Sequence, residues 1–175
     1  MAKTIEGAKI TLNKMMHTID SNIYGHFIEE VGECIHDGIW VDSSPLKDLP
    51  MSTHPSLPNV REDLLQASKA LFGQANKDAQ TVLRWPGGCY SDTYHWQDGL
   101  GNRDMRPVIK NPHWGHGPFR FVKNEHGALG PDINHQFGTD EFMAFSEQLQ
   151  ANTYINVNYG SGTPEEAAQW VEYCN

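Results

Sequence analysis

Segments typical of β-strands alternate along this 175-residue chain with amphipathic segments typical of α-helices, and this alternation limits its fold more than any other feature. Apolar and β-branched runs predict the strands, and apolar side chains at helical spacing predict the helices. The predicted strands are residues 19–28, 81–85 and 153–158, and the predicted helices are residues 61–72, 139–149 and 163–175. Because alternation of this kind builds parallel β-α-β units, we expect an α/β fold.

The helix ends carry local signals. Thr163 is followed by Pro164 and two glutamates, the pattern of an N-cap, a proline at the first helical position and acids in the first turn. Thr139 is a second expected N-cap, and Gly73 is an expected C-cap. A further short strand is expected over residues 8–12.

Two long loops separate these elements. Residues 42–59 are rich in proline and serine, and residues 97–138 are dense in Gly, Pro, Asn and His without a periodic segment. A loop of this second length is functional or poorly ordered, since loops beyond about 12–15 residues are uncommon. In α/β folds the loops that follow the carboxyl ends of strands are where sites are built.

Charge and composition exclude several classes of partner. A net charge of −9 argues against nucleic acid and against a polybasic contact with membranes. No apolar run reaches the roughly 18 residues of a membrane span, and the first residues lack the apolar core of a signal peptide. Three widely spaced cysteines form no metal or redox motif. We therefore expect a reduced, cytoplasmic protein without membrane or nucleic-acid partners.

Polar residues near the first two strand ends could carry chemistry. Glu29 and Glu30 follow the first strand, where a carboxylate can accept hydrogen bonds from a polar ligand; alternatively they form a surface pair. Arg84 lies in an apolar strand, and because an unpaired guanidinium is costly to bury we expect a carboxylate partner. The alternative for Arg84 is a surface position. Gly87 and Gly88 then allow close approach of the backbone to a ligand.

Further along the chain the signals are weaker. Cys89 by itself is typical of a buried small residue rather than of a nucleophile. The aromatic residues 94–96, ending in Trp96, suit carbohydrate because sugar faces pack on rings; the alternative is a loop anchored by a buried tryptophan. Residues 156–160 either line a site or cap a strand. Histidines of the long loop fit no metal-ligand spacing, so neither a metal nor a cofactor is expected: they are His113, His116, His126 and His135.

Six motifs occur in a characteristic order along nearly the whole chain. They are Ile23–Glu29, Gly38–Val41, Leu83–Cys89, Tyr94–Gly99, Phe137–Phe142 and Trp170–Asn175. Together they resemble the N-terminal part of the glycoside hydrolase family 51 α-L-arabinofuranosidases. Several separate motifs in the same order are a stronger signal than any one of them.

The resemblance implies a (β/α)8 barrel followed by a β-sandwich domain, in a protein expected to be a homo-oligomer. Residues 1–18 would contribute a strand to the sandwich, and residues 19–175 would form the first part of the catalytic TIM barrel, with about three βα units. The chain is short for a complete barrel, which needs roughly 250 residues. The implied activity is retaining hydrolysis of terminal non-reducing α-L-arabinofuranosyl groups from arabinan and arabinoxylan oligosaccharides.

Four residues match family positions at or near the sugar site. By resemblance, Glu29 hydrogen-bonds the bound arabinose, Arg84 supports the catalytic nucleophile, and Cys89 and Trp96 lie at or near the sugar. Retaining hydrolysis needs two carboxyl groups, and the family carries both on later barrel strands. We therefore expect the acid/base and nucleophile beyond residue 175 and no catalytic residue in this chain.

Two hypotheses from different classes follow. The first is the truncated N-terminal piece of an arabinofuranosidase, inactive alone, whose partners are an arabinofuranosyl oligosaccharide and the missing C-terminal part of the barrel and sandwich. The second is a non-catalytic carbohydrate-binding module that keeps half of a sugar site. The chain ends directly after an amphipathic segment without a closing strand, which favours the first hypothesis.

Overall fold

The strands form a parallel sheet. A computed structural model describes residues 7, 17–41, 46–74, 81–113 and 132–175. Strands β1 (His26–Phe27), β2 (Val82–Trp85) and β5 (Asn152–Ile155) pair in the order β1-β2-β5, and both pairings are parallel. This confirms the expected α/β fold with parallel strands, and the strands lie in chain order.

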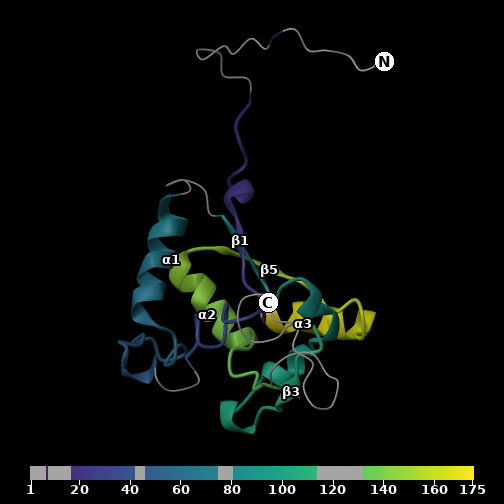
Figure 1. Ribbon diagram of the computed structural model, residues 1–175. Coiled ribbons are helices and arrows are strands. Elements are labelled where there is room, and N and C mark those ends of the chain that lie inside the picture. Colours follow the sequence, from purple (N-terminus) through teal and green to yellow (C-terminus); the bar gives the residue numbers. More distant parts are fainter. Residues whose placement is uncertain (1–6, 8–16, 42–45, 75–80, 114–131) are drawn as a thin grey trace.

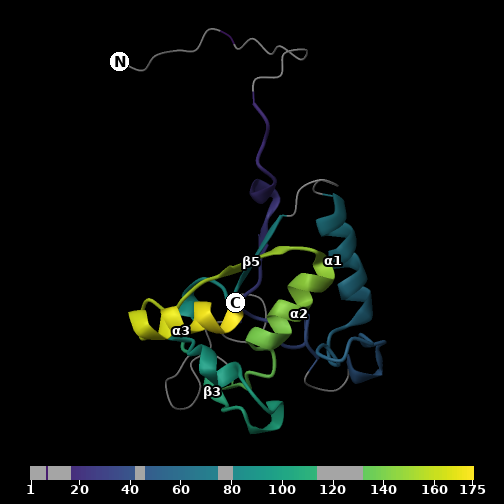
Figure 2. The ribbon, with the colours of Figure 1, turned by 180° about the vertical axis from the view of Figure 1, so that it is seen from behind.

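Three α-helices accompany the sheet. They are α1 (Glu62–Gln74), α2 (Thr139–Leu149) and α3 (Pro164–Cys174). Figures 1 and 2 show α1 and α2 side by side, with α2 between α1 and α3 in both views. At α3 the Thr163 hydroxyl accepts a hydrogen bond from the Glu166 N–H at 3.0 Å, so the predicted N-cap is confirmed.

Other predicted boundaries were wrong for local reasons. The residues before β1 form a 3-10 helix (Ser21–Tyr24) instead of a strand, because the Asp20 side chain accepts from the Asn22 N–H and caps the turn. Gly73 lies inside α1 and does not cap it. The N-cap of α2 is Gly138, one residue before the predicted Thr139. The strand expected over residues 8–12 lies outside the described residues.

The segments expected to be irregular contain short ordered elements. Antiparallel strands β3 (Ile109–Lys110) and β4 (Asp132–Ile133) pair within the long loop, where no strand was predicted. Short 3-10 helices cover Leu46–Asp48, Cys89–Thr93, Trp96–Gly99 and Arg103–Met105. Elements of two to five residues are too short to leave a periodic pattern in the sequence.

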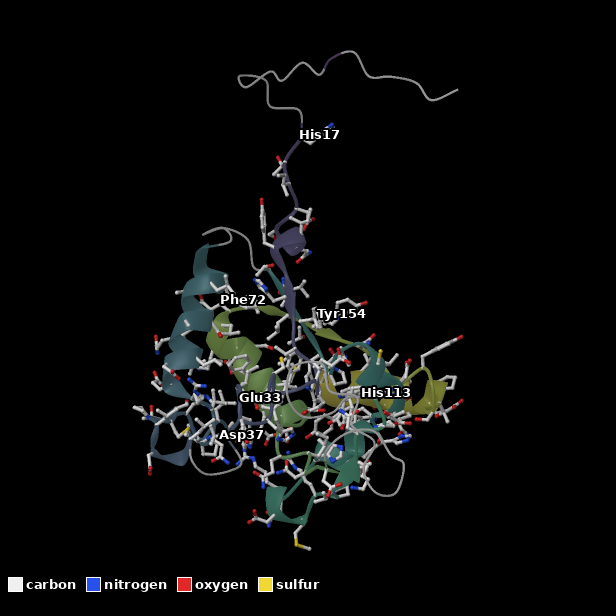
Figure 3. All side chains as sticks on the ribbon, in the orientation of Figure 1. His17, Glu33, Asp37, Phe72, His113 and Tyr154 are labelled. Atoms are coloured by element: carbon white, nitrogen blue, oxygen red, sulfur yellow. The ribbon has the colours of Figure 1, made fainter. Side chains whose placement is uncertain are left out.

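The two faces of the sheet differ in burial. Leu83 and Trp85 of β2 point to the side of the core and are about 1% exposed. Arg84, between them, points to the other face, and its partners in register are Phe27 and Tyr154, so these three residues form one row across the three strands. Phe27 and Tyr154 are 56% and 51% exposed. Figure 3 shows Tyr154 on the side of the strands away from Phe72 of α1.

Trp85 lies at the centre of an aromatic core. Its ring stacks on Phe142 of α2 at 5.0 Å and meets Trp170 of α3 edge-on at 5.8 Å. It also meets Tyr94 edge-on at 5.2 Å, which brings in the segment after β2. Each such pair contributes about 0.5–1.5 kcal/mol beyond the area it buries. One strand residue therefore fixes two helices and a loop against the sheet.

A buried carboxylate ties the long loop to the start of α2. Glu141 is 1% exposed and accepts two hydrogen bonds from Arg106, at 2.9 and 3.1 Å, and a third from the Nε of Arg103 at 2.7 Å. Its Oε2 also accepts from the Gly138 N–H at 2.8 Å, which caps the helix. Because a buried charge is tolerated only with such partners, these contacts require the loop to lie where it does.

The same arginines fix backbone on three segments. Arg106 donates to the carbonyl oxygens of His135 at 2.9 Å, Gln136 at 3.1 Å and Gly101 at 3.0 Å. Arg103 donates to the carbonyl oxygen of Ser56 at 2.9 Å, in a segment far away in sequence. The loop is therefore held by charge-assisted hydrogen bonds rather than by regular secondary structure.

Arg106→Ala should destabilise the chain by about 3 kcal/mol or more, because it leaves Glu141 buried without its bidentate partner. Urea unfolding of the purified chain measures this loss. Lys110→Ala is the matched control, since Lys110 pairs with Asp132 at 2.7 Å but both side chains are about half exposed. Its cost should stay within about 1 kcal/mol. Equal costs for the two variants would contradict the role given to Glu141.

Candidate functional site

Glu29 lies where β1 ends, packed against the turn that follows β2. Gly87 has a φ of +134°, and a Cβ built on it would fall 2.2 Å from the Glu29 Cγ. A Cβ on Gly88 would lie 3.4 Å from the Glu29 Oε2. Gly87 therefore permits a close approach of the turn to the Glu29 side chain, whereas the approach of a ligand to the glycine pair stays a prediction.

The Glu29 carboxylate is held by the backbone of the segment that follows the glycine turn after β2. Its Oε1 accepts a hydrogen bond from the Tyr90 N–H at 3.1 Å, and the residue is 6% exposed. Glu29 is thus a buried, fixed acceptor and not one of a pair of surface glutamates. Glu30 is equally buried and pairs with the Nε2 of His36 at 3.3 Å.

Cys89 stands between these contacts, as the first residue of the 3-10 helix after β2. Its side chain is exposed and its thiol is free, so the expectation of a buried small residue was wrong. Tyr90, the residue that follows it, donates its N–H to Glu29. The structure therefore brings Glu29 and Cys89 to the same edge of the sheet.

Arg84 lies on the open face of the sheet, next to this edge. Its guanidinium carbon lies 4.9 Å from the centre of the Phe27 ring, in a cation-π contact. Its Nε is buried without a hydrogen-bond partner. Among the described residues Arg84 forms no ion pair with a carboxylate, so the predicted pairing is not found within this part of the chain.

Trp96 lies away from solvent, in the aromatic core. It is 6% exposed, stacks on Trp170 at 6.1 Å with the rings 6° from parallel, and donates from its indole N–H to the carbonyl oxygen of Glu166. This matches the alternative of a loop anchored by a buried tryptophan. The structure does not bring Trp96 to the surface beside Glu29.

Asn156 follows β5 and joins its end to that of β2. Its amide donates to the carbonyl oxygen of Gly87 at 2.7 Å and to the Ser91 hydroxyl at 2.6 Å. Of the two sequence interpretations, strand cap and site lining, these contacts support the first. They also fix the glycine turn from the side opposite Glu29's strand.

Tyr90 and His135 form a buried contact that no sequence pattern predicted. The Tyr90 hydroxyl and the His135 Nε2 are 3.0 Å apart, and both residues are buried. His135 had been considered only as a possible metal ligand. The nearest signal in the sequence was its position just before the motif Phe137–Phe142.

A polar cavity of about 550 Å³ lies beside the Glu141 network. None of the four residues predicted for the sugar site lines it. Its walls include Arg103, Arg106 and Glu141, so this cavity is formed by the contacts that hold the long loop.

The described residues offer neither a metal-binding cluster nor a membrane-spanning helix. They contain no group of three or more His, Cys, Asp or Glu side chains placed to hold a metal ion. None of the helices among them is long and apolar enough to cross a membrane.

Gly87→Ala should destabilise the chain by about 2 kcal/mol or more, because the new Cβ meets Glu29 and the backbone angle disfavours an L side chain. Urea unfolding measures the change. Gly73→Ala is the control: Gly73 is helical and its Cβ would meet nothing within 4 Å, so this variant should gain about 0.5–1 kcal/mol. Two effects of the same sign would show that the contact with Glu29 is misjudged.

Comparison with known proteins gives a consistent result. The family described as "Alpha-L-arabinofuranosidase 1 domain" matches residues 77–175. The intracellular exo-alpha-L-arabinofuranosidase of Bacteroides ovatus is 39% identical over 155 residues, which is 89% of this chain and 25% of that protein. Alpha-L-arabinofuranosidase C of Emericella nidulans is 37% identical over 169 residues, or 97% of this chain and 28% of that protein.

Solved structures agree. The family 51 arabinofuranosidase of Xanthomonas axonopodis pv. citri superposes with a TM-score of 0.65 at 36% identity, covering 88% of this chain and 26% of that one. The thermostable enzyme of Thermotoga petrophila superposes with a TM-score of 0.67 at 36% identity, covering 90% and 26%. The chain spans about a quarter of the length of the relatives it matches. It belongs to the α-L-arabinofuranosidases of glycoside hydrolase family 51.

Proposed function

We propose that this chain supplies the first three strands and part of the sugar site of a retaining α-L-arabinofuranosidase. The observation that carries the proposal is the fixed, buried Glu29 carboxylate at the carboxyl edge of a parallel sheet. In (β/α)8 enzymes the site is built at that edge. Residues 19–175 then belong to the catalytic barrel, and residues 1–18 to a β-sandwich domain.

In this proposal each predicted residue has a distinct task. Glu29 accepts hydrogen bonds from the hydroxyls of a terminal arabinofuranosyl group, because its carboxylate is already fixed by Tyr90. Cys89 borders the same sugar from the exposed start of its 3-10 helix. Trp96 acts from within the core, by anchoring the loop against α3.

Arg84 supports a catalytic carboxylate supplied by later strands. Its buried Nε has no partner among the described residues, and such a donor is costly unless a partner is provided. A guanidinium offers the planar donor geometry that suits a carboxylate. The exposed row of Phe27 and Tyr154 on the same face fits a barrel interior that the remaining strands would cover.

The substrates we propose are arabinan and arabinoxylan oligosaccharides, and the location we propose is the cytoplasm. One relative is named as an intracellular exo-acting enzyme, and this name supports both an exo mode of attack and a cytoplasmic location for the protein proposed here. The free thiols of Cys34, Cys89 and Cys174 also fit a reducing compartment. A homo-oligomeric state of the complete protein stays a prediction.

The purified 175-residue chain should not hydrolyse an aryl α-L-arabinofuranoside above the buffer rate. Retaining hydrolysis needs two carboxyl groups roughly 5–5.5 Å apart, and loss of a catalytic group removes several orders of magnitude in rate. A chromogenic assay decides this. Turnover that Glu29→Gln abolishes would show a catalytic carboxylate within this segment and contradict the proposal.

When the chain is extended to the length of its relatives, activity should appear. Glu29→Gln should then lower kcat/KM by about 10- to 100-fold, the value of one or two hydrogen bonds to a charged group. Lys110→Ala serves as the control, because it removes only the half-exposed ion pair between Lys110 and Asp132. It should leave kcat/KM unchanged. Sugar binding without hydrolysis in the extended chain would favour the alternative of a carbohydrate-binding module.

A further inference from the structure

The main chain of Tyr90 helps to hold the Glu29 carboxylate. The Tyr90 N–H donates to the Glu29 Oε1 at 3.1 Å, and the Tyr90 ring is only 4% exposed. Tyr90 belongs to a five-residue 3-10 helix, whose few internal hydrogen bonds leave its placement to side-chain contacts. Whatever anchors the Tyr90 side chain therefore also positions the donor for Glu29.

One hydrogen bond anchors that side chain at its far end. The Tyr90 hydroxyl lies 3.0 Å from the Nε2 of His135, while the Nδ1 of His135 lies 2.8 Å from the carbonyl oxygen of Pro107. A carbonyl oxygen only accepts, so Nδ1 carries the proton and the neutral ring accepts at Nε2. The Tyr90 hydroxyl is therefore the donor, and burial raises its pKa well above the usual value.

His135 is itself fixed from several sides. Its ring stacks on Tyr94 at 5.6 Å with 19° between the planes, and its carbonyl oxygen accepts from Arg106 at 2.9 Å. The charged or titratable groups that act on it are Glu30, His36, Asp98, Arg106, Tyr90 and Tyr94. Burial is the largest influence and lowers the pKa of His135, which favours the neutral ring that the hydrogen bonds require.

We propose that His135 is a positioning residue for the sugar site, acting through the Tyr90 hydroxyl to hold the Tyr90 N–H against Glu29. The path runs from the Pro107 carbonyl through His135 and Tyr90 to the Glu29 carboxylate, and every link is a direct contact. The role of Glu29 as a sugar ligand rests on the proposed function, but the coupling along this path does not. Misplacement of a site group by about 1 Å can cost roughly 100-fold in rate, so such support matters.

Two tyrosines of the same cluster allow a matched test. Tyr90→Phe removes the hydroxyl that His135 holds, whereas Tyr94→Phe removes a buried hydroxyl that has no hydrogen-bond partner among the described residues. In the purified chain, hydrogen exchange at the amide of residue 90 should become about tenfold faster in Tyr90→Phe. It should stay within about twofold of the parent in Tyr94→Phe. Equal changes in the two variants would mean a general loss of packing and would overturn the proposal.

A second readout follows the titration of His135. Because its folded pKa is lowered, the ring stays neutral until the pH falls below its usual value of about 6.5, and then the acceptor at Nε2 is lost. The resonance of the Tyr90 ring carbon that bears the hydroxyl should therefore show a step on that acid side in the parent, because this hydroxyl donates to Nε2. His135→Gln, whose amide does not titrate, should remove the step. A step that persists in this variant would contradict the coupling.

Activity separates this inference from the proposed function. In the chain extended to family length, Tyr90→Phe should lower kcat/KM for the aryl arabinofuranoside, and Tyr94→Phe should not. If the extended parent hydrolyses no arabinofuranoside, the proposed function fails while the exchange and resonance results still decide the coupling. If activity is present but both tyrosine variants keep it and keep the amide exchange of the parent, the positioning role fails.

Discussion

The buried carboxylate of Glu141 is the contact on which the rest of this structure depends. It neutralises Arg106 at two oxygens and binds Arg103 and the first turn of α2. A charge that is 1% exposed cannot be left alone, so the chain between β2 and α2 must bring its arginines to this point. Once there, Arg106 fixes the carbonyl oxygens of His135 and Gln136.

This contact reaches the candidate site through a short series of further contacts. His135, held by Arg106 at its backbone, accepts from the Tyr90 hydroxyl, and Tyr90 donates its N–H to Glu29. The glycine turn at Gly87 then lets the Glu29 side chain lie against β2's end. The Glu29 carboxylate and the packing of the long loop are thus parts of one hydrogen-bonded network.

The sequence alone predicted what depends on local pattern. The three helices, the parallel strands, the Thr163 cap and the position of Glu29 at a strand end follow from periodicity, capping chemistry and the order of the motifs. It did not predict the pairing of Glu141 with Arg106, because that contact joins residues 35 positions apart. For the same reason it expected a carboxylate beside Arg84, where the neighbouring strand instead brings the Phe27 ring.

A double-mutant cycle between Arg106→Ala and Glu141→Gln tests the central claim most directly. Unfolding free energies of the parent, the two single variants and the double variant give the coupling between the two side chains. If the pair holds the loop, the coupling should reach about 2 kcal/mol or more, since either single change already loses the contact. Costs that add within about 0.5 kcal/mol would show that the two side chains act independently and would contradict the account.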